Sequence, residues 1–245
     1  MNQHQIEIER NRLAWDSKPL IHAIYQAFYA KVIPHLLPGK TLELGSGLGK
    51  IKAFIPQAIT SDLYLNPGID QVESAYKLSF ANGSLSNIIL IDVWHHLRYP
   101  GLALQEFARV LLPGGQVFLI EPAMGYLPRL VYQLLHHEPV AMREPIEWFP
   151  ENRDASFDIE YFASQSQAWK MFYQGQSMTK IDQWQLQECA VWSDFAYLLS
   201  GGFSKPALYP MALRPAVQMI DKMLTKISPQ IFAARMLVRL KKNTD

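Results

Sequence analysis

The sequence predicts an α/β fold, in which an open, mostly parallel, Rossmann-like sheet of seven strands carries helices on both faces. Two observations predict it. Short apolar runs such as "NIILIDV" at 87–93 have the length and composition of buried parallel strands. Segments of helical periodicity alternate with these runs, and a glycine-rich turn follows the first of them. Such alternation favours a sheet with helices on both faces rather than a sandwich or a bundle.

The N-terminal half predicts a helix and three strands. Apolar residues recur at helical spacing from Pro19 to Pro34, and Asp16 or Ser17 is placed to cap this helix. "KTLELG" predicts the first strand, a short helix follows at 51–54, and "QAITSDL" predicts a second strand that ends at Asp62. "IDQVES" is the candidate third strand. Only about seven residues connect it to the second, too few for a crossover helix, so it is either stunted or wrongly assigned.

The central part of the chain predicts two further strands. "NIILIDV" is the fourth, and a helix over 102–111 follows it until Pro113-Gly114-Gly115 stops the helix. "QVFLIEP", at 116–122, predicts the fifth strand.

The segment 124–180 differs from the rest in its many aromatic residues and helical pieces. A stretch of this length between two strands predicts an inserted helical cap within a single domain, 1–245. After it, "WQLQECAVWS" predicts the sixth strand, and a helix with one apolar stripe follows. "FAARMLVRLKK", at 232–242, predicts a last strand, expected to be antiparallel, with a solvated basic face.

Composition excludes several classes of protein. With 49% hydrophobic and 18% charged residues among 245, the chain is typical of a folded globular protein. A net charge of +1 disfavours nucleic acid as a partner, and the single Cys189 cannot form an internal disulfide. The polar N-terminus and the absence of a long uncharged stretch predict neither a signal peptide nor a membrane span. We therefore expect a cytoplasmic protein, and peripheral membrane contact through the basic end is disfavoured.

The glycine turn "ELGSGLG" follows the first predicted strand and indicates a ligand site. Glycines there let the chain bend and let a ligand approach the backbone. A dinucleotide fingerprint needs a glycine at its sixth position, which is Lys50 here. The carboxylate of Glu43, beside the turn, also suits a ligand with an ammonium group better than a pyrophosphate. A nicotinamide-dependent oxidoreductase remains as a less favoured alternative.

This turn resembles the first motif of the class I S-adenosylmethionine (SAM)-dependent methyltransferases. The family's later motifs follow in order: Asp62 at the end of the second strand, "DVWHHL" at 92–97 and "ARVLLPGGQVFLIEP" at 108–122. The resemblance extends from about residue 40 to 122. Within the family, the chain is most similar to the ubiquinone-biosynthesis-like branch and its poorly characterised bacterial relatives, in which "WDSKP" and "HHEPV" also occur.

The resemblance implies SAM as the cofactor and a set of residues that hold it. Glu43 would lie near the amino group of SAM, and Asp62 would accept hydrogen bonds from the ribose. In relatives, the loop after the third strand often carries an acidic residue next to an alanine, and this acid contacts the adenine amino group. The matching pair in this chain is Ser74-Ala75. Ala75 backbone groups and apolar packing would then hold the adenine, or adenine would bind more weakly. The implied cofactor residues are Glu43, Gly45, Ser46, Gly47, Gly49, Asp62, Leu63, Ala75 and Asp92.

The expected reaction is methyl transfer by in-line displacement to a small-molecule substrate. Such an enzyme works mainly by positioning, so a general base is needed only when the acceptor must lose a proton. His95, His96 and His136 are the candidates, in that order, although His95 and His96 could instead pack beneath the methionine part of SAM. His136-His137-Glu138 could suggest a metal site, but no metal is predicted, because neighbouring histidines on a helix point in different directions and no third ligand is suitably spaced.

Two further expectations concern the acceptor and the rival functions. The aromatic density of 124–180 favours an apolar or aromatic, lipid-like acceptor, although such residues more often form core. A catalytically silent methyltransferase-like binding domain is the main alternative. The presence of both Glu43 and Asp62 argues against it, because a scaffold needs neither acceptor.

Overall fold

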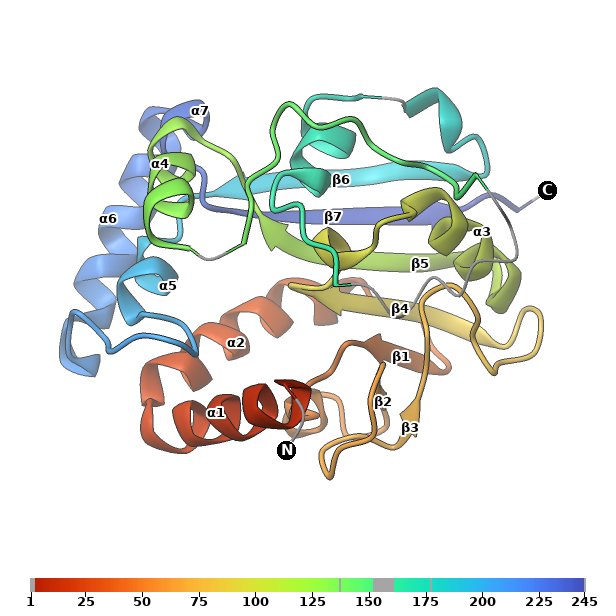
Figure 1. Ribbon diagram of the computed structural model, residues 1–245, viewed down its shortest axis with the longest axis horizontal. Coiled ribbons are helices and arrows are strands. Elements are labelled where there is room, and N and C mark those ends of the chain that lie inside the picture. Colours follow the sequence, from red (N-terminus) through yellow and green to blue (C-terminus); the bar gives the residue numbers. More distant parts are fainter. Residues whose placement is uncertain (1–2, 137, 152–160, 177, 245) are drawn as a thin grey trace.

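Seven strands form one sheet in the order β3-β2-β1-β4-β5-β7-β6 (Figure 1). The computed structural model describes residues 3–136, 138–151, 161–176 and 178–244. β7 runs antiparallel to both of its neighbours and the other strands are parallel, as predicted. The strands are β1 (Thr41–Leu44), β2 (Ile59–Asp62), β3 (Gln71–Val72), β4 (Leu85–Ile91), β5 (Leu111–Pro122), β6 (Trp184–Trp192) and β7 (Arg235–Lys242).

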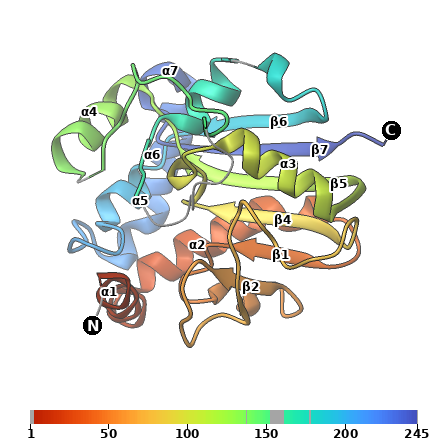
Figure 2. The ribbon, with the colours of Figure 1, turned by 45° about the vertical axis from the view of Figure 1, so that its right-hand side comes forward.

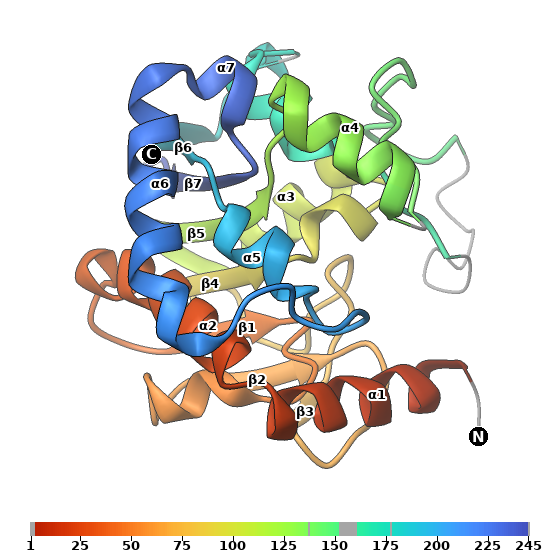
Figure 3. The same cartoon turned by 90° about the vertical axis from the view of Figure 1, so that its left-hand side faces the viewer.

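The helices cover both faces of this sheet. Figure 3 shows α6 on one side of the strands and α3 on the other. Figure 2 shows α1, α4 and α5 gathered at the end of the sheet toward which β4 and β5 point. The α-helices are α1 (Gln3–Ser17), α2 (Pro19–Val32), α3 (Pro100–Val110), α4 (Tyr126–Leu135), α5 (Phe195–Ser200), α6 (Arg214–Ile227) and α7 (Pro229–Phe232).

β4 lies at the centre of the sheet and is buried on both faces. Ile88 and Leu90 belong to the apolar cluster that contains Phe107 of α3. Ile89 packs in the opposite cluster, with Phe28 of α2. A strand that packs in two cores needs apolar residues at every position, which explains the unbroken apolar run in its sequence.

The connection from β2 to β3 contains no helix. β3 is only two residues long, so of the two readings of "IDQVES" the stunted strand is correct. The predicted short helix after β1 is a 3-10 helix, Lys50–Ala53.

The N-terminus differs from the sequence prediction. The polar segment before Pro19 forms α1. The sequence did not predict this helix because its residues form no apolar stripe. The predicted cap of the following helix is therefore wrong. The hydroxyl of Ser17 donates to the Leu13 carbonyl within α1, at 2.6 Å, and Asp16 pairs with Arg12. Because one residue separates the helices, the N-cap of α2 is Lys18, without a side-chain hydrogen bond.

The C-terminal strand also begins later than predicted. Phe232 ends α7, and β7 starts at Arg235. The apolar stripe of α6 lies largely at the surface, where Ile227 is 68% exposed. The helix is held instead by buried Asp221, whose carboxylate accepts hydrogen bonds from the backbone N–H groups of Phe195 and Ala196 at the start of α5.

The insertion between β5 and β6 is less regular than the predicted helical cap. α4 is present, but "YFASQSQAWKMFYQ" contains only a π-helical turn at Trp169–Tyr173. Trp148 and Trp169 bury their rings in the cluster that contains Phe107, so this segment packs on the face that carries α3. The part of the predicted cap at 152–160 lies outside the described residues. No helix in the described ranges has the length and apolarity to cross a bilayer.

Candidate cofactor and acceptor site

The glycine turn after β1 needs its glycines for two physical reasons. Gly45, Gly47 and Gly49 all adopt positive φ angles, of 66°, 52° and 63°. A β-carbon on Gly45 would lie 2.4 Å from the Val93 side chain, and one on Gly49 would lie 1.7 Å from the Gly68 carbonyl oxygen. The turn is therefore both left-handed and tightly packed, which only glycine allows without strain.

Asp62 ties the end of β2 to this turn. Its Oδ2 accepts a hydrogen bond from the Gly47 N–H at 3.0 Å, and its Oδ1 accepts one from the Leu63 N–H at 2.7 Å. Ser46 completes the link, because its N–H donates to the Ser61 carbonyl at 2.8 Å. Asp62 thus fixes the shape of the turn, whatever it contacts in a ligand.

A cavity of about 530 Å³ opens beside the turn, at the carboxyl ends of β1, β4 and β5. Residues of α1, α4 and α5 complete its walls. It brings together a large share of the predicted site residues: Glu43, Gly45, Ser46, Gly47, Asp92, His95, His96 and His136. The other predicted residues are not among those that line it: Gly49, Asp62, Leu63 and Ala75. Ala75 packs against the apolar cluster of the sheet instead.

Glu43 places a buried carboxylate with spare hydrogen-bonding capacity in the cavity wall. The side chain is 3% exposed, and its Oε1 accepts a hydrogen bond from the Tyr29 hydroxyl at 2.7 Å. Its Oε2 is buried without a partner among the described residues. Burial raises the pKa of Glu43 to about 7, against the lowering effect of the hydrogen bond from Tyr29. The unused oxygen fits a ligand that brings an ammonium group, as SAM does.

Asp92 lies at the carboxyl end of β4 and is neutralised by the protein itself. Its φ angle of 55° is unusual for a residue other than glycine. Both carboxylate oxygens pair with the guanidinium of Arg235, which is 1% exposed and lies over the rings of Phe28 and Tyr197. The predicted solvated face of the last strand is therefore wrong at Arg235.

His95 and His96 occupy a 3-10 turn, Trp94–His96, directly after β4. His95 Nδ1 lies 2.7 Å from Oε2 of Glu121, a fully buried carboxylate near the end of β5. His96 Nδ1 lies 2.9 Å from the carbonyl oxygen of Phe162 in the insertion. Since each Nδ1 has an acceptor, each imidazole carries its proton there and turns Nε2 away from it.

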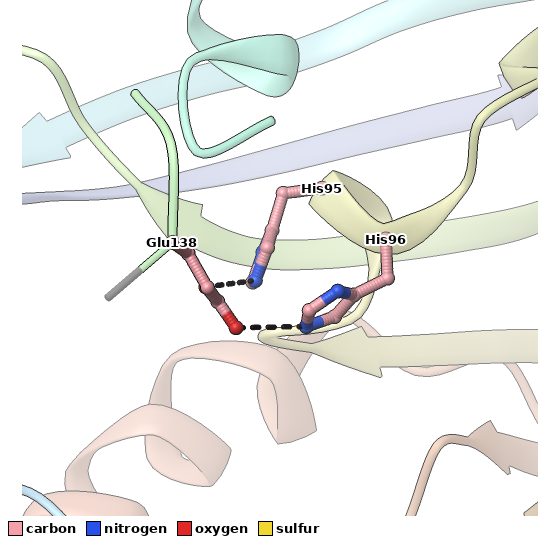
Figure 4. A group of neighbouring side chains, drawn as sticks. All are labelled: His95, His96 and Glu138. Carbon is pink, nitrogen blue, oxygen red and sulfur yellow. Dashed lines mark ion pairs between the residues drawn. The ribbon is translucent and has the colours of Figure 1, made fainter. Parts of the chain in front are cut away.

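The two Nε2 atoms converge on Glu138, which follows α4 (Figure 4). His95 Nε2 lies 3.5 Å from Glu138 Oε2, and His96 Nε2 lies 3.6 Å from Oε1. His136 Nδ1 is 3.7 Å from Oε2 of the same carboxylate. The three predicted histidines therefore meet around one acid, which we call the His–Glu cluster: His95, His96, His136 and Glu138.

The pKa values of the two buried histidines move in opposite directions. Burial lowers the pKa of His95, but Glu121 and Glu138 outweigh burial and raise it to about 10. Burial and the positive charge of His95 lower the pKa of His96. Near neutral pH the ligand-free cluster therefore holds a protonated His95 beside a neutral His96.

Sequence reasoning missed Glu121, Glu138 and Arg235 as members of the site. "HHEPV" and "FLIEP" contain the two acids, but only the fold shows that they meet His95.

A comparison with protein families identifies the central part of the chain. Residues 42–119, from β1 into β5, match the profile of the family described as "Methyltransferase domain". The match covers about a third of the chain. The silent-domain and oxidoreductase alternatives are not favoured. No curated protein sequence matches the chain.

Solved structures support the same fold. A protein provisionally assigned as a sarcosine dimethylglycine methyltransferase, from Galdieria sulphuraria, is 12% identical, with a TM-score of 0.53 over 96% of this chain and 99% of its own. A SAM-dependent methyltransferase from Archaeoglobus fulgidus is 11% identical, with a TM-score of 0.51 over 90% and 94% of the two chains. A chain in the complex of the Haloferax volcanii activator Trm112 with a methyltransferase is 13% identical, with a TM-score of 0.50 over 100% and 99%. At these identities the likeness shows the fold of class I methyltransferases.

Proposed function

We propose that this protein is a SAM-dependent methyltransferase, and that its acceptor is a small molecule with an apolar or aromatic, lipid-like body and a polar group that reaches the His–Glu cluster. One observation carries the proposal. A single cavity joins the spare carboxylate oxygen of Glu43 to His95, His96 and Glu138, so the cofactor and the acceptor would share one enclosed space.

The cofactor half of this space is assigned to the residues around the glycine turn. SAM supplies a methyl group activated by a positively charged sulfur. Glu43 Oε2 accepts from its ammonium, and the Gly45–Gly47 backbone borders its amino acid part. Asp62 binds the ribose with the lone pairs that its two backbone hydrogen bonds leave over. Gly49, Leu63 and Ala75 surround the adenine, and Asp92, held by Arg235, shapes the floor.

The acceptor half is assigned to the walls between α4 and α5. Val131 and Leu135 of α4 face the cavity together with Leu198 of α5. These side chains suit an apolar or aromatic body and exclude water from it. Neutral His96 is the preferred proton acceptor when the reacting atom carries a proton, while protonated His95 orients the acceptor's polar group. His136 lies at the same end and limits the size of that group.

The chain's place within the family and the role of its insertion are also proposals. "WDSKP" and "HHEPV" support the bacterial, ubiquinone-biosynthesis-like branch. The insertion 124–180 supplies His136 and Glu138, so we assign it the role of the acceptor cap in a single domain, 1–245.

Isothermal titration calorimetry with SAM, S-adenosylhomocysteine and NADH tests the cofactor half. We expect both SAM-type ligands to bind and NADH not to bind. Asp62→Ala should weaken SAM binding by about 1–3 kcal/mol, because a half-buried carboxylate that accepts hydrogen bonds is lost. Glu147→Gln, at an exposed carboxylate paired with Arg98, is the matched control and should leave the affinity unchanged. NADH binding without SAM binding would overturn the assignment.

The acceptor half is tested by methyl transfer from radiolabelled SAM to panels of phenols, quinols, alkyl amines and sugars. Transfer to the apolar or aromatic compounds, lost in His96→Ala, is the expected result. Transfer only to the polar sugars would contradict the proposed acceptor class.

A further inference from the structure

Three members of the His–Glu cluster, His95, His96 and Glu138, bring potential ligand atoms close enough together for one metal ion to bind them. His95 Nε2 and His96 Nε2 lie 3.5 and 3.6 Å from oxygens of Glu138, and one ligand atom from each residue can be chosen within 4.8 Å of the others. Zinc binds histidine nitrogen and carboxylate oxygen at about 2.0–2.2 Å, so two ligands of a tetrahedral ion lie about 3.4 Å apart. A direct N–H···O hydrogen bond would be shorter, at about 2.9 Å.

The groups behind these ligands hold them in the orientation that a metal requires. Glu121 accepts from Nδ1 of His95, and its other oxygen accepts from the backbone N–H groups of Val93 and Trp94, at 2.8 and 2.7 Å. The Phe162 carbonyl fixes His96 in the same way. Histidines that bind metals almost always give their second nitrogen to a carboxylate or a carbonyl, because this bond sets the tautomer and the direction of the ring.

Glu138 is oriented by its own partners. The Tyr161 hydroxyl donates to Oε1 at 2.8 Å, and the Gln165 side-chain amide donates to Oε2. The side chain retains about a tenth of its exposed surface, so it lies between the protein interior and the cavity. Two carboxylates, Glu121 and Glu138, thus flank His95 from opposite sides and provide negative charge that a cation can balance.

We propose that His95, His96 and Glu138 bind a divalent transition-metal ion of the zinc type at the acceptor end of the cavity. Two imidazole nitrogens disfavour Mg²⁺ and Ca²⁺, which prefer oxygen. Two histidines and one glutamate leave a coordination position open, as in catalytic zinc sites. That position faces the cavity, because both histidines and Glu138 line it.

The open position defines the chemical class of the acceptor. An ion there would bind a hydroxyl or phenol oxygen and favour loss of its proton to solvent, so that oxygen becomes the methylated atom. This role rests on the proposed function, but with the ion bound both Nε2 atoms are ligands, so the ion replaces His96 as the group that promotes loss of the proton and replaces His95 in orienting the acceptor. Binding of the ion does not rest on the proposed function. The sequence alone predicted no metal because Glu138 reaches the two histidines only through the irregular chain that follows α4.

Metal binding is tested on the full chain, stripped with a chelator and dialysed. Calorimetric titration with ZnCl₂ should give one ion per chain with a dissociation constant below about 1 µM. Co²⁺ should give the intense visible absorption of a low-coordinate site. His96→Ala and Glu138→Gln should each weaken Zn²⁺ binding at least 10-fold, because a ligand is lost. The controls His35→Ala and Glu147→Gln, outside the cluster, should bind as the wild type does.

The metal titration and the SAM titration can fail independently, and each failure has its own meaning. Circular dichroism melting verifies that each variant is folded. Absence of a stoichiometric ion, or unchanged affinity in folded His96→Ala and Glu138→Gln, overturns the metal site. SAM titration of the same stripped samples tests the proposed function separately, since the cofactor half needs no ion. If the ion binds but catechol leaves the Co²⁺ spectrum unchanged, the site exists and its role in holding an oxygen acceptor is refuted.

Discussion

Glu43→Gln should stabilise the ligand-free protein at high pH, although it removes a cofactor contact. The pKa of Glu43 is raised from 4.5 to about 7 by burial. A shift of about 2.5 units corresponds to about 3 kcal/mol. Because the folded-state pKa is higher than the unfolded one, the associated stability is complete below pH 4.5 and is lost as the pH rises through 7. Above pH 7 the wild type bears the full cost of a buried charge, which glutamine does not bear.

Urea unfolding at pH 5 and pH 8 measures this difference. We expect Glu43→Gln to gain up to about 3 kcal/mol at pH 8 and much less at pH 5, since Tyr29 can still donate to the amide oxygen. Glu147→Gln, whose carboxylate is exposed, should show no such dependence on pH. If Glu43→Gln is no more stable than the wild type at pH 8, the assignment of a destabilising buried charge at Glu43 is refuted.

The same carboxylate links SAM affinity to pH. A protonated Glu43 cannot attract an ammonium, so SAM should bind more weakly to the wild type as the pH falls below about 7. Glu43→Gln should bind SAM weakly at every pH, with a flat profile in calorimetry. A wild-type profile that is equally flat would place the ammonium elsewhere.

Two further predictions concern the backbone and the ion pair at the same edge of the sheet. Gly49→Ala should destabilise the fold by more than about 2 kcal/mol, since its β-carbon would meet the Gly68 carbonyl. A β-carbon on Gly47 has open space, so Gly47→Ala should cost only about 1–2 kcal/mol, for its positive φ. Chemical denaturation compares the two variants, and equal losses of stability would contradict the steric argument. Asp92→Asn should cost about 1.5–3 kcal/mol in thermal unfolding, because buried Arg235 loses its two close contacts and keeps the more distant carboxylate of Asp194, at 3.9 Å. A loss below about 0.5 kcal/mol would show that the pair is dispensable.

The elements that sequence predicted best are those whose pattern is set by local physics. The run Ile88–Ile91 of β4 is apolar at every position because both faces of the strand are buried. The glycine turn is recognisable in the sequence because no other residue fits at Gly45 and Gly49 without strain. By contrast, α1 was missed because its residues lack an apolar stripe. It docks near its end, where the Trp15 ring stacks on His22 of α2.

The parts of the site that sequence missed depend on contacts between distant segments. Alternation along the last strand located Arg235 but did not reveal that it is buried. Its partner Asp92 lies at the end of β4, and β5 separates β4 from β7 in the sheet. Glu138 meets His95 only in the folded protein, where it lies beside the turn Trp94–His96 (Figure 4). No periodicity encodes such a meeting, so the cofactor turn was predictable and the acceptor end was not.

Three carboxylates at the carboxyl ends of adjacent strands explain why this edge binds a cationic ligand at one point. Asp92, after β4, is neutralised by Arg235, and Glu121 of β5 is paired with His95. Glu43 of β1 has only the Tyr29 hydroxyl and a raised pKa. A buried carboxylate without a cationic partner lowers stability unless a ligand supplies the charge. Of the three, Glu43 is therefore the carboxylate at which a bound cation would return the most free energy, and this supports its proposed place beside the ammonium of the cofactor.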